Sequence, residues 1–464
     1  MSDQKRGAAD FGTLPLPRLL ISMALPAIIA NVFNSLYNIV DQIFIGRGIG
    51  YLGNAATSIS FPLTIICLAF GLLCGIGGAA EFNLSMGRGQ QNRAGHIVGN
   101  AISMAVIFGV LTAVLVLLFL EPLLLLFGAT DATLGYAKAY TGITAIGLPF
   151  LMFTIAANPL VRADGSPIRS MMAVIIGAVL NTILDPIFIF VFHWGISGAA
   201  LATTISQIVS ALYFALYFSR FRSVKLDRDC FRLKSRVMRS IAALGSSGFI
   251  FQFSNMLVQI VTNNMLRTHG AVSSYGSDVA LAVSGIVLKL NAIFIAVIIG
   301  VVQGAQPILG YNFGAGQYRR VRGTVKLTLS FSLFISCMAF AVFELFPTQL
   351  LSIFGEGSDM YVKFGTIYIR VFLLFTILNG VQIAASTFFQ AIGQAGKGAV
   401  LSLLKQVVIL LPLLMILPQF FGVYGVIYAG PIVDLIAFGT ATAWLVLEMR
   451  KIRSYEDRSL PANG

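Results

Sequence analysis

Long apolar segments separated by short polar connections run through the whole sequence. Twelve of them approach or exceed the roughly 20 residues that a helix needs to cross a bilayer. Their predicted limits are 19–45, 53–83, 95–120, 135–158, 168–193, 197–219, 241–267, 280–311, 323–346, 361–389, 398–420 and 424–449. The pattern predicts an all-α polytopic membrane protein with twelve transmembrane helices.

The first apolar segment is interrupted by polar residues at helical spacing. Asn31, Asn34, Asn38 and Asp41 fall on one face of the predicted helix, and Pro26 lies in its interior. A carboxylate in hydrocarbon costs about 2.5–3.5 kcal/mol on the insertion scale unless it faces a cavity or a partner. We therefore expect this face to line a water-accessible cavity, where Asp41 exchanges a cation.

A second acidic residue lies in the middle of the fifth segment. Asn181 and Asp185 are one helical turn apart, and Pro186 frees a backbone carbonyl beside the carboxylate. The sixth segment offers Thr203 among several other polar side chains. If the first, fifth and sixth helices meet, Asp41 joins these residues in one cluster.

Such a cluster of acids, amide and hydroxyl has two possible uses. Burial and a neighbouring like charge favour the protonated form of a carboxyl group, so that one acid can hold a proton. Oxygen ligands also suit a hard cation, and a sodium-coupled site would use Asp41, Asn181, Asp185 and Thr203 as ligands. The alternative is structural, with the acids and asparagines only hydrogen-bonding neighbouring helices. No other cofactor is expected.

Composition and charge support a membrane protein and indicate its orientation. Of the 464 residues, 57% are hydrophobic and only 11% are charged, against about a quarter in soluble domains. The net charge of +13 is concentrated in alternate connections, most densely in the segment 220–239. Basic connections collect in the cytoplasm, so we expect both termini there, no cleavable signal peptide and no affinity for nucleic acid. Four cysteines without metal spacing are expected to be free thiols.

Short motifs repeat along the chain at a common offset. Gly87-Arg88-Gly89-Gln90 returns as Gly314-Ala315-Gly316-Gln317, and Phe127-Gly128 returns as Phe354-Gly355, both 227 residues later. The repeat predicts an N-terminal six-helix bundle (1–219), a basic cytoplasmic linker (220–240) and a C-terminal six-helix bundle (241–464). An even number of spans gives both halves the same orientation, a common transporter design with the site between the halves.

The second half repeats the scaffold but not the acids. Its first helix carries a polar face of amides, and Pro412 occupies the position that corresponds to Asp185. We therefore expect ion handling in the first half and substrate contact in both. The residues predicted to line the substrate cavity are Asn34, Tyr37, Asn38, Gln207, Gln252, Asn255 and Gln259.

Several other charges fall inside predicted spans. Lys289 and Arg370 could line the cavity or extend to an interface, whereas Lys405 lies nearer a span end and is expected to extend to it. Glu81 is expected to pair with Arg88 or Arg93, and Asp434 is a secondary candidate for the site.

These features resemble the multidrug and toxic compound extrusion (MATE) transporters along nearly the whole chain. The resemblance rests on the duplication, the first span with its proline and acid, and the segments MGRGQQNRAGHIVG, ADGSPIRSMMAVIIGAVLNTILDPIFIF, GISGAALAT and QAIGQAGKGAVLSLLKQ. It implies two six-helix bundles around a central V-shaped cavity. It also implies efflux of cationic or lipophilic drugs in exchange for protons or sodium, by alternating access.

The same resemblance assigns roles to individual residues. In the branch that this chain is most similar to, the N-terminal half holds the ion site, and the matching positions are Asp41, Asn181, Asp185 and Thr203. Bending of the first helix at Pro26 is implied to follow protonation. Another branch uses acids in the seventh and tenth helices, and those acids are absent here.

Two other functions compete with drug efflux. A lipid-linked oligosaccharide flippase of the same superfamily would be expected to line its cavity with several Arg or Lys for pyrophosphate. A receptor or channel is the other alternative, but a channel normally gains pore symmetry from an oligomer. We expect a monomeric, non-enzymatic antiporter of the plasma (inner) membrane, in contact with membrane lipid and small-molecule substrates.

Overall fold

A computed structural model describes residues 8–353 and 359–459, and every regular element within them is helical. The principal helices are α1 (Leu16–Gly48), α2 (Tyr51–Gly87), α3 (Gln91–Leu118), α5 (Asp131–Ala163), α6 (Pro167–Pro186), α7 (Gly195–Phe218), α8 (Ser235–Ala271), α9 (Gly276–Gly314), α10 (Tyr318–Leu345), α12 (Asp359–Phe372), α13 (Thr376–Ala391), α14 (Ala395–Leu403), α15 (Leu411–Phe421) and α16 (Val423–Ser459). Shorter elements are η1 (Ala8–Gly12), α4 (Leu120–Leu126), η3 (Arg228–Phe231), α11 (Pro347–Ser352) and two π-helical turns, η2 (Ile187–Val191) and η4 (Leu404–Leu410).

Eleven stretches of the described chain are long and apolar enough to cross a membrane, and α12 with α13 forms a twelfth that is bent by 47°. The predicted twelve-helix fold is therefore confirmed. The bend was not expected from the sequence. Beside it, the Thr376 hydroxyl donates to the Leu373 carbonyl at 2.6 Å, and such side-chain bonds compete with the helical ladder.

The internal repeat is visible in the backbone. Glycines with positive φ recur at nearly constant offsets, as Gly89 and Gly316 (φ 74° and 70°) show for the turn that follows the second helix of each half. Gly195 and Gly422 are likewise matched, at 55° and 57°. The Phe354-Gly355 member of the predicted repeat lies outside the described residues.

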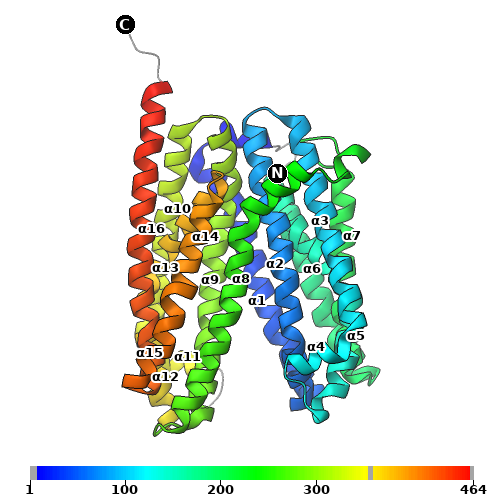
Figure 1. Cartoon of the computed structure of the whole chain (residues 1–464), viewed down its shortest axis with the longest axis vertical. Helices are drawn as coiled ribbons and strands as arrows, with labels where there is room; N and C mark the ends of the chain where they lie inside the picture. The colour runs from blue at the N-terminus through cyan, green and yellow to red at the C-terminus, as the bar shows by residue number, and fades with distance from the viewer. Residues whose placement is uncertain (1–7, 354–358, 460–464) are drawn as a thin grey trace.

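The helices form two bundles, one from α1–α7 and one from α8–α16 (Figure 1). The largest apolar core of the first bundle is built mainly from α2, α3 and α5, and that of the second from α9, α12 and α16. A third apolar cluster joins the two, because Leu19, Leu20 and Met23 of α1 pack with Ala305 and Ile308 of α9.

The two bundles touch at one end of the molecule and separate toward the other (Figure 1). We call the touching end, which carries the connections 88–90, 219–234 and 315–317, the basic end. There a Cβ added at Gly245 of α8 would overlap the Leu73 carbonyl of α2, and one at Gly304 of α9 would overlap Ala24 of α1. Only glycine permits these backbone approaches, so the close contact is encoded at these positions.

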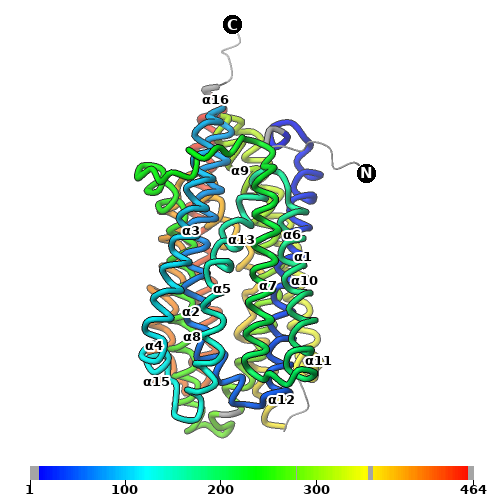
Figure 2. The backbone as a smooth tube through the Cα atoms, turned by 90° about the vertical axis from the view of Figure 1, so that its right-hand side faces the viewer, coloured from blue at the N-terminus to red at the C-terminus, as the bar shows by residue number. Residues whose placement is uncertain are grey.

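The start of α1, the end of α16 and the linker between α7 and α8 all lie at the basic end (Figure 2). The linker is fastened to the first bundle through Asn100 of α3. The Asn100 amide donates to the carbonyls of Cys230 (3.1 Å) and Arg232 (3.0 Å), and its oxygen accepts from the Lys234 amide at 2.7 Å. All four cysteines are free thiols, as expected.

Candidate functional site

The two acids predicted from the sequence come together between α1 and α6. Asp41 lies in the last third of α1, and Asp185 lies next to the C-terminal residue of α6. Their carboxyl groups are hydrogen-bonding neighbours. We call Asp41 and Asp185 the acid pair. Because an ionised carboxylate can only accept hydrogen bonds, two carboxyl groups in contact require a shared proton or a bound cation.

The amide of Asn181 connects the acid pair to α7. Its Nδ2 donates to Asp185 Oδ1 at 3.3 Å and to Thr203 Oγ1 at 3.4 Å. Asp185 is 0% exposed and Asn181 is 2% exposed, whereas Asp41 is partly exposed. Asp41 is therefore the member of the acid pair through which a cation can enter from solvent.

Three oxygens around the acid pair lack a hydrogen-bond partner among the described residues. They are Asp41 Oδ1, Asn181 Oδ1 and Asp185 Oδ2, and each is buried. A buried acceptor without a donor is costly, and natural proteins retain few of them. Three such oxygens side by side favour a site that is completed by a proton or by a small cation.

Two tyrosines that flank the acid pair complete the cluster. Tyr37 of α1 lies close enough to both acids to interact electrostatically with them, and Tyr140 of α5 hydrogen-bonds Thr203. The sequence placed Tyr37 among the residues of the substrate cavity, and that role stays a prediction. Tyr140 was missed, although Tyr140, Thr141 and Thr144 form a hydroxyl-bearing patch that helical spacing could have revealed.

A small cavity with both polar and apolar lining residues adjoins this cluster within the first bundle. It has a volume of about 40 Å³, enough for ordered water, which needs about 10–15 Å³ on this measure. Tyr140 and Thr203 line its inner side, and Ser60, Thr141 and Gln207 are among its other lining residues. Gln207 therefore lines this internal cavity, and its role in the substrate cavity stays a prediction.

The polar face of α1 changes partners along its length. Asn31 bridges to the second bundle, donating to Gln303 Oε1 at 3.2 Å and to the Ala296 carbonyl at 3.4 Å. Beyond it, Asn34 and Asn38 are exposed. Pro26 is buried within α1, which continues through it as one helix.

The matching face of the second bundle lies on α8. Asn255 and Gln259 are exposed, and Gln252 is half-buried. Asn255 also accepts a hydrogen bond from Gln406 of η4 at 3.1 Å. These predicted cavity residues thus remain accessible, and the cavity role itself stays a prediction.

The second bundle contains a polar centre of its own. Lys405 of η4 forms an ion pair with Asp434 of α16 at 3.0 Å, and both side chains are largely buried, at 16% and 11% exposed. Asn379 of α13 donates to Asp434 at 2.9 Å and accepts from Lys405. We call these three residues the lysine triad. The expectation that Lys405 extends to an interface is therefore wrong, because its charge is neutralised within the bundle.

The remaining charged residues within spans have separate roles. Arg370 is exposed and pairs with Glu344 at 3.7 Å, and Glu81 pairs with Arg93, as one of its two expected partners. Lys289 of α9 is exposed.

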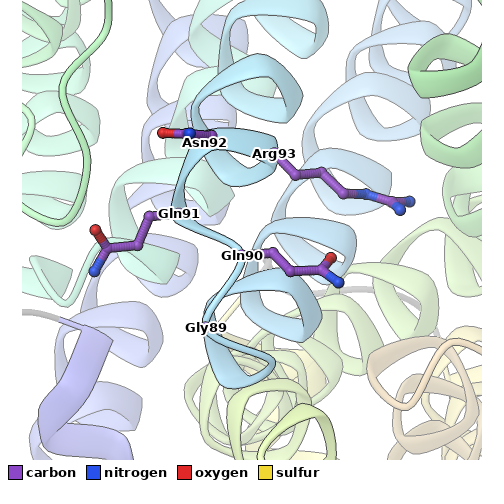
Figure 3. A pocket seen from close by; sticks show the side chains of 5 residues that line it. All are labelled: Gly89, Gln90, Gln91, Asn92 and Arg93. Carbon is purple, nitrogen blue, oxygen red and sulfur yellow. The ribbon is translucent and has the colours of Figure 1, made fainter.

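A larger hollow lies at the basic end, on the turn between α2 and α3. It measures about 530 Å³ and is lined by Gly89, Gln90, Gln91, Asn92 and Arg93. Gln91 and Asn92 extend to one side of the turn and Gln90 and Arg93 to the other, so that the four side chains do not converge on a common centre (Figure 3). We therefore place the functional site at the acid pair and not at this open turn.

Known proteins match this chain along nearly its whole length. The Multidrug export protein MepA of Staphylococcus haemolyticus (strain JCSC1435) is 27% identical over 452 residues, which cover 96% of each chain. The protein of the same name from Staphylococcus aureus (strain MSSA476) is 26% identical over 422 residues, covering 90% of this chain and 91% of that one.

Solved structures match the fold. One described as the outward-facing conformation of a multidrug resistance MATE family transporter of the MOP superfamily superposes with a TM-score of 0.90 at 21% identity, covering 98% of this chain and 100% of that one. The sequence profile of the MatE family matches residues 26–187 and 253–416. The chain therefore belongs to the MatE family of multidrug and toxic compound extrusion transporters.

Proposed function

We propose that this protein exports cationic or lipophilic compounds in exchange for a proton or a sodium ion. The observation that carries the proposal is the acid pair, two adjoining carboxyl groups with three unpartnered buried oxygens around them. A cation that enters from solvent binds these oxygens, and after it leaves they can attract another positively charged group. The coupling cation and a cationic substrate can therefore bind in turn.

The contacts between the bundles support transport by alternating access. The bundles are closed against each other at the basic end and diverge toward the other end. Positively charged connections favour the cytoplasm, so the basic end, with both termini, faces the cytoplasm of a plasma (inner) membrane. In this arrangement the site is open to the outside, where substrate leaves and the coupling cation enters.

The exposed polar residues of α1 and α8 favour the binding of small organic substrates. The exposed amides Asn34 and Asn38 of α1 and Asn255 and Gln259 of α8 offer hydrogen bonds without a dominant charge. Relatives bear the name multidrug export protein. The pump works as a monomer embedded in lipid, because both halves of the site lie in one chain.

Dye efflux from cells tests this function. Cells that express the protein should export ethidium, and export should stop when a proton uncoupler or removal of sodium collapses the coupling gradient. Ethidium export that is unaffected by either treatment would contradict cation coupling. The flippase alternative requires the opposite result, with no export of any cationic dye and a lipid precursor that accumulates on deletion.

A further inference from the structure

The contacts between α1 and α9 fix which residues of the two helices lie opposite each other. The helices run antiparallel, because Ala24 of α1 packs on Gly304 of α9, Ile28 packs on Gly300, and Asn31 hydrogen-bonds the carbonyl of Ala296. Residue numbers therefore rise along α1 as they fall along α9. The same register predicts the facing residues where the helices separate.

Lys289 falls opposite Asn38 in this register. Lys289 lies seven residues before Ala296, and Asn38 lies seven residues after Asn31. Seven residues are close to two helical turns, so each lies on the face of its helix that makes the contact, about 10 Å further from the basic end. Lys289 and Asn38 therefore occupy the same level on opposite walls.

The accessibility of this region agrees with an open space between the walls. Both Lys289 and Asn38 are exposed. Gly285, one turn beyond Lys289 on the same face, has no described atom within 4 Å of where its Cβ would lie. Among the described residues, no ion pair involves Lys289, whereas the charge of Lys405 is neutralised in the lysine triad.

The walls thus carry opposite charges at similar depth. The first bundle contributes the acid pair beside Asn38, since Asp41 is one turn from Asn38 along α1. The second bundle contributes the ammonium group of Lys289. A ligand that matches both walls carries a positive group and a negative group.

We propose that Lys289 binds the carboxylate of zwitterionic substrates whose cationic group lies toward the acid pair. The inference rests on the proposed export function and names Lys289 as a residue that selects among substrates at the same site. A charge-assisted hydrogen bond from an ammonium group to a carboxylate is stronger than a neutral one. Purely cationic compounds gain nothing from Lys289 and are repelled by it.

Rhodamine B and its ethyl ester test this directly, because the dyes differ only in whether the carboxylate is free. Their affinities for the purified full-length protein in detergent are measured by fluorescence polarisation. We expect Lys289→Met to weaken rhodamine B binding by about tenfold or more and to strengthen binding of the ester. Lys289→Arg should retain the preference for the zwitterion. Lys326→Met, which removes an exposed lysine of α10, serves as the control and should change neither affinity.

Two results would overturn the assignment. One is a Lys289→Met protein that loses affinity for both dyes equally or for neither. The other is a wild-type protein that binds the ester but not rhodamine B. If Lys289→Met does not fold, Lys289→Gln keeps a polar side chain and carries the same comparison. Ethidium export is measured separately, so that failure of the export function is distinguishable from failure of this inference.

Discussion

Each bundle holds a buried polar centre with carboxyl and amide groups, but only the centre of the second bundle contains a positively charged side chain. The two carboxyl groups of the acid pair lie with the amide of Asn181 and the hydroxyl of Thr203, and no basic side chain among the described residues bonds either acid. The lysine triad has one carboxylate, one amide and an ammonium group that pairs with the carboxylate at 3.0 Å. One centre needs a cation from outside, and the other contains its own.

This difference shows how a duplicated scaffold becomes asymmetric. A buried carboxylate must be paired, protonated or bound to a cation, because burying an isolated charge is very costly. In the second bundle the ammonium group of Lys405 permanently neutralises the carboxylate of Asp434. In our proposal an exchangeable ion neutralises the acid pair of the first bundle, and an ion gradient can drive that exchange.

Removing either carboxylate of the acid pair should have the largest effect. We expect Asp41→Asn and Asp185→Asn each to abolish gradient-driven efflux of ethidium while leaving expression intact, because an amide cannot exchange a proton or hold a cation equally well. Efflux from cells and membrane protein levels are the measurements. Normal drug resistance in both variants would refute the role of the pair.

Breaking the lysine triad should affect stability more than coupling. Lys405→Met leaves Asp434 buried without its ion-pair partner, and the loss of one partner costs about 3–5 kcal/mol. The thermal unfolding midpoint in detergent should fall clearly. The double variant Lys405→Met/Asp434→Asn should recover most of the loss, and equal midpoints for the single and double variants would show that the ion pair is not the cause.

A smaller effect is expected from the phenol beside the acid pair. Tyr140→Phe removes one hydrogen bond to Thr203, which is worth about 0.5–1.5 kcal/mol, so a shift of a few-fold is expected in the cation concentration that gives half-maximal efflux. Tyr51→Phe, at an exposed tyrosine near the start of α2, is the control. An unchanged half-maximal cation concentration in Tyr140→Phe would show that Tyr140 does not contribute to cation binding.

The smallest expected effect concerns the flexibility of α1. Pro26 lacks the amide hydrogen that would complete the helical ladder, so Pro26→Ala should stiffen α1 and slow dye efflux by about twofold without weakening substrate binding. Pro17→Ala changes only the first turn, where no such bond is lost, and should leave the rate unchanged. Equal dye-efflux rates for the wild-type, Pro26→Ala and Pro17→Ala proteins would show that Pro26 has no role in the transport cycle.

Helical periodicity predicted the membrane fold and four of the polar residues at the acid pair. Asp41, Asn181, Asp185 and Thr203 each lie on a polar face of an apolar helix, and such faces must meet one another or water. The bundles and their shared orientation followed from the repeat of short glycine motifs, which keep the same backbone conformation in both halves.

The sequence does not show which side chains of different helices contact one another. Lys405 and Asp434 are 29 residues apart on separate helices, and neither position alone reveals that the two side chains meet. The contact of Tyr140 with Thr203 likewise joins two helices, so the hydroxyl-bearing patch that carries Tyr140 does not by itself reveal this partner. The bend between α12 and α13 coincides with a local side-chain hydrogen bond at Thr376, which helical propensity does not predict.

The central claim is that the acid pair alone couples transport to an ion gradient. Purified protein in liposomes, given pH and sodium gradients separately, tests it most directly. We predict that one of the two gradients drives ethidium transport by the wild-type protein and by Lys405→Met/Asp434→Asn, and that neither gradient drives it in Asp41→Asn or Asp185→Asn. Gradient-driven transport by both of these single variants would contradict the account.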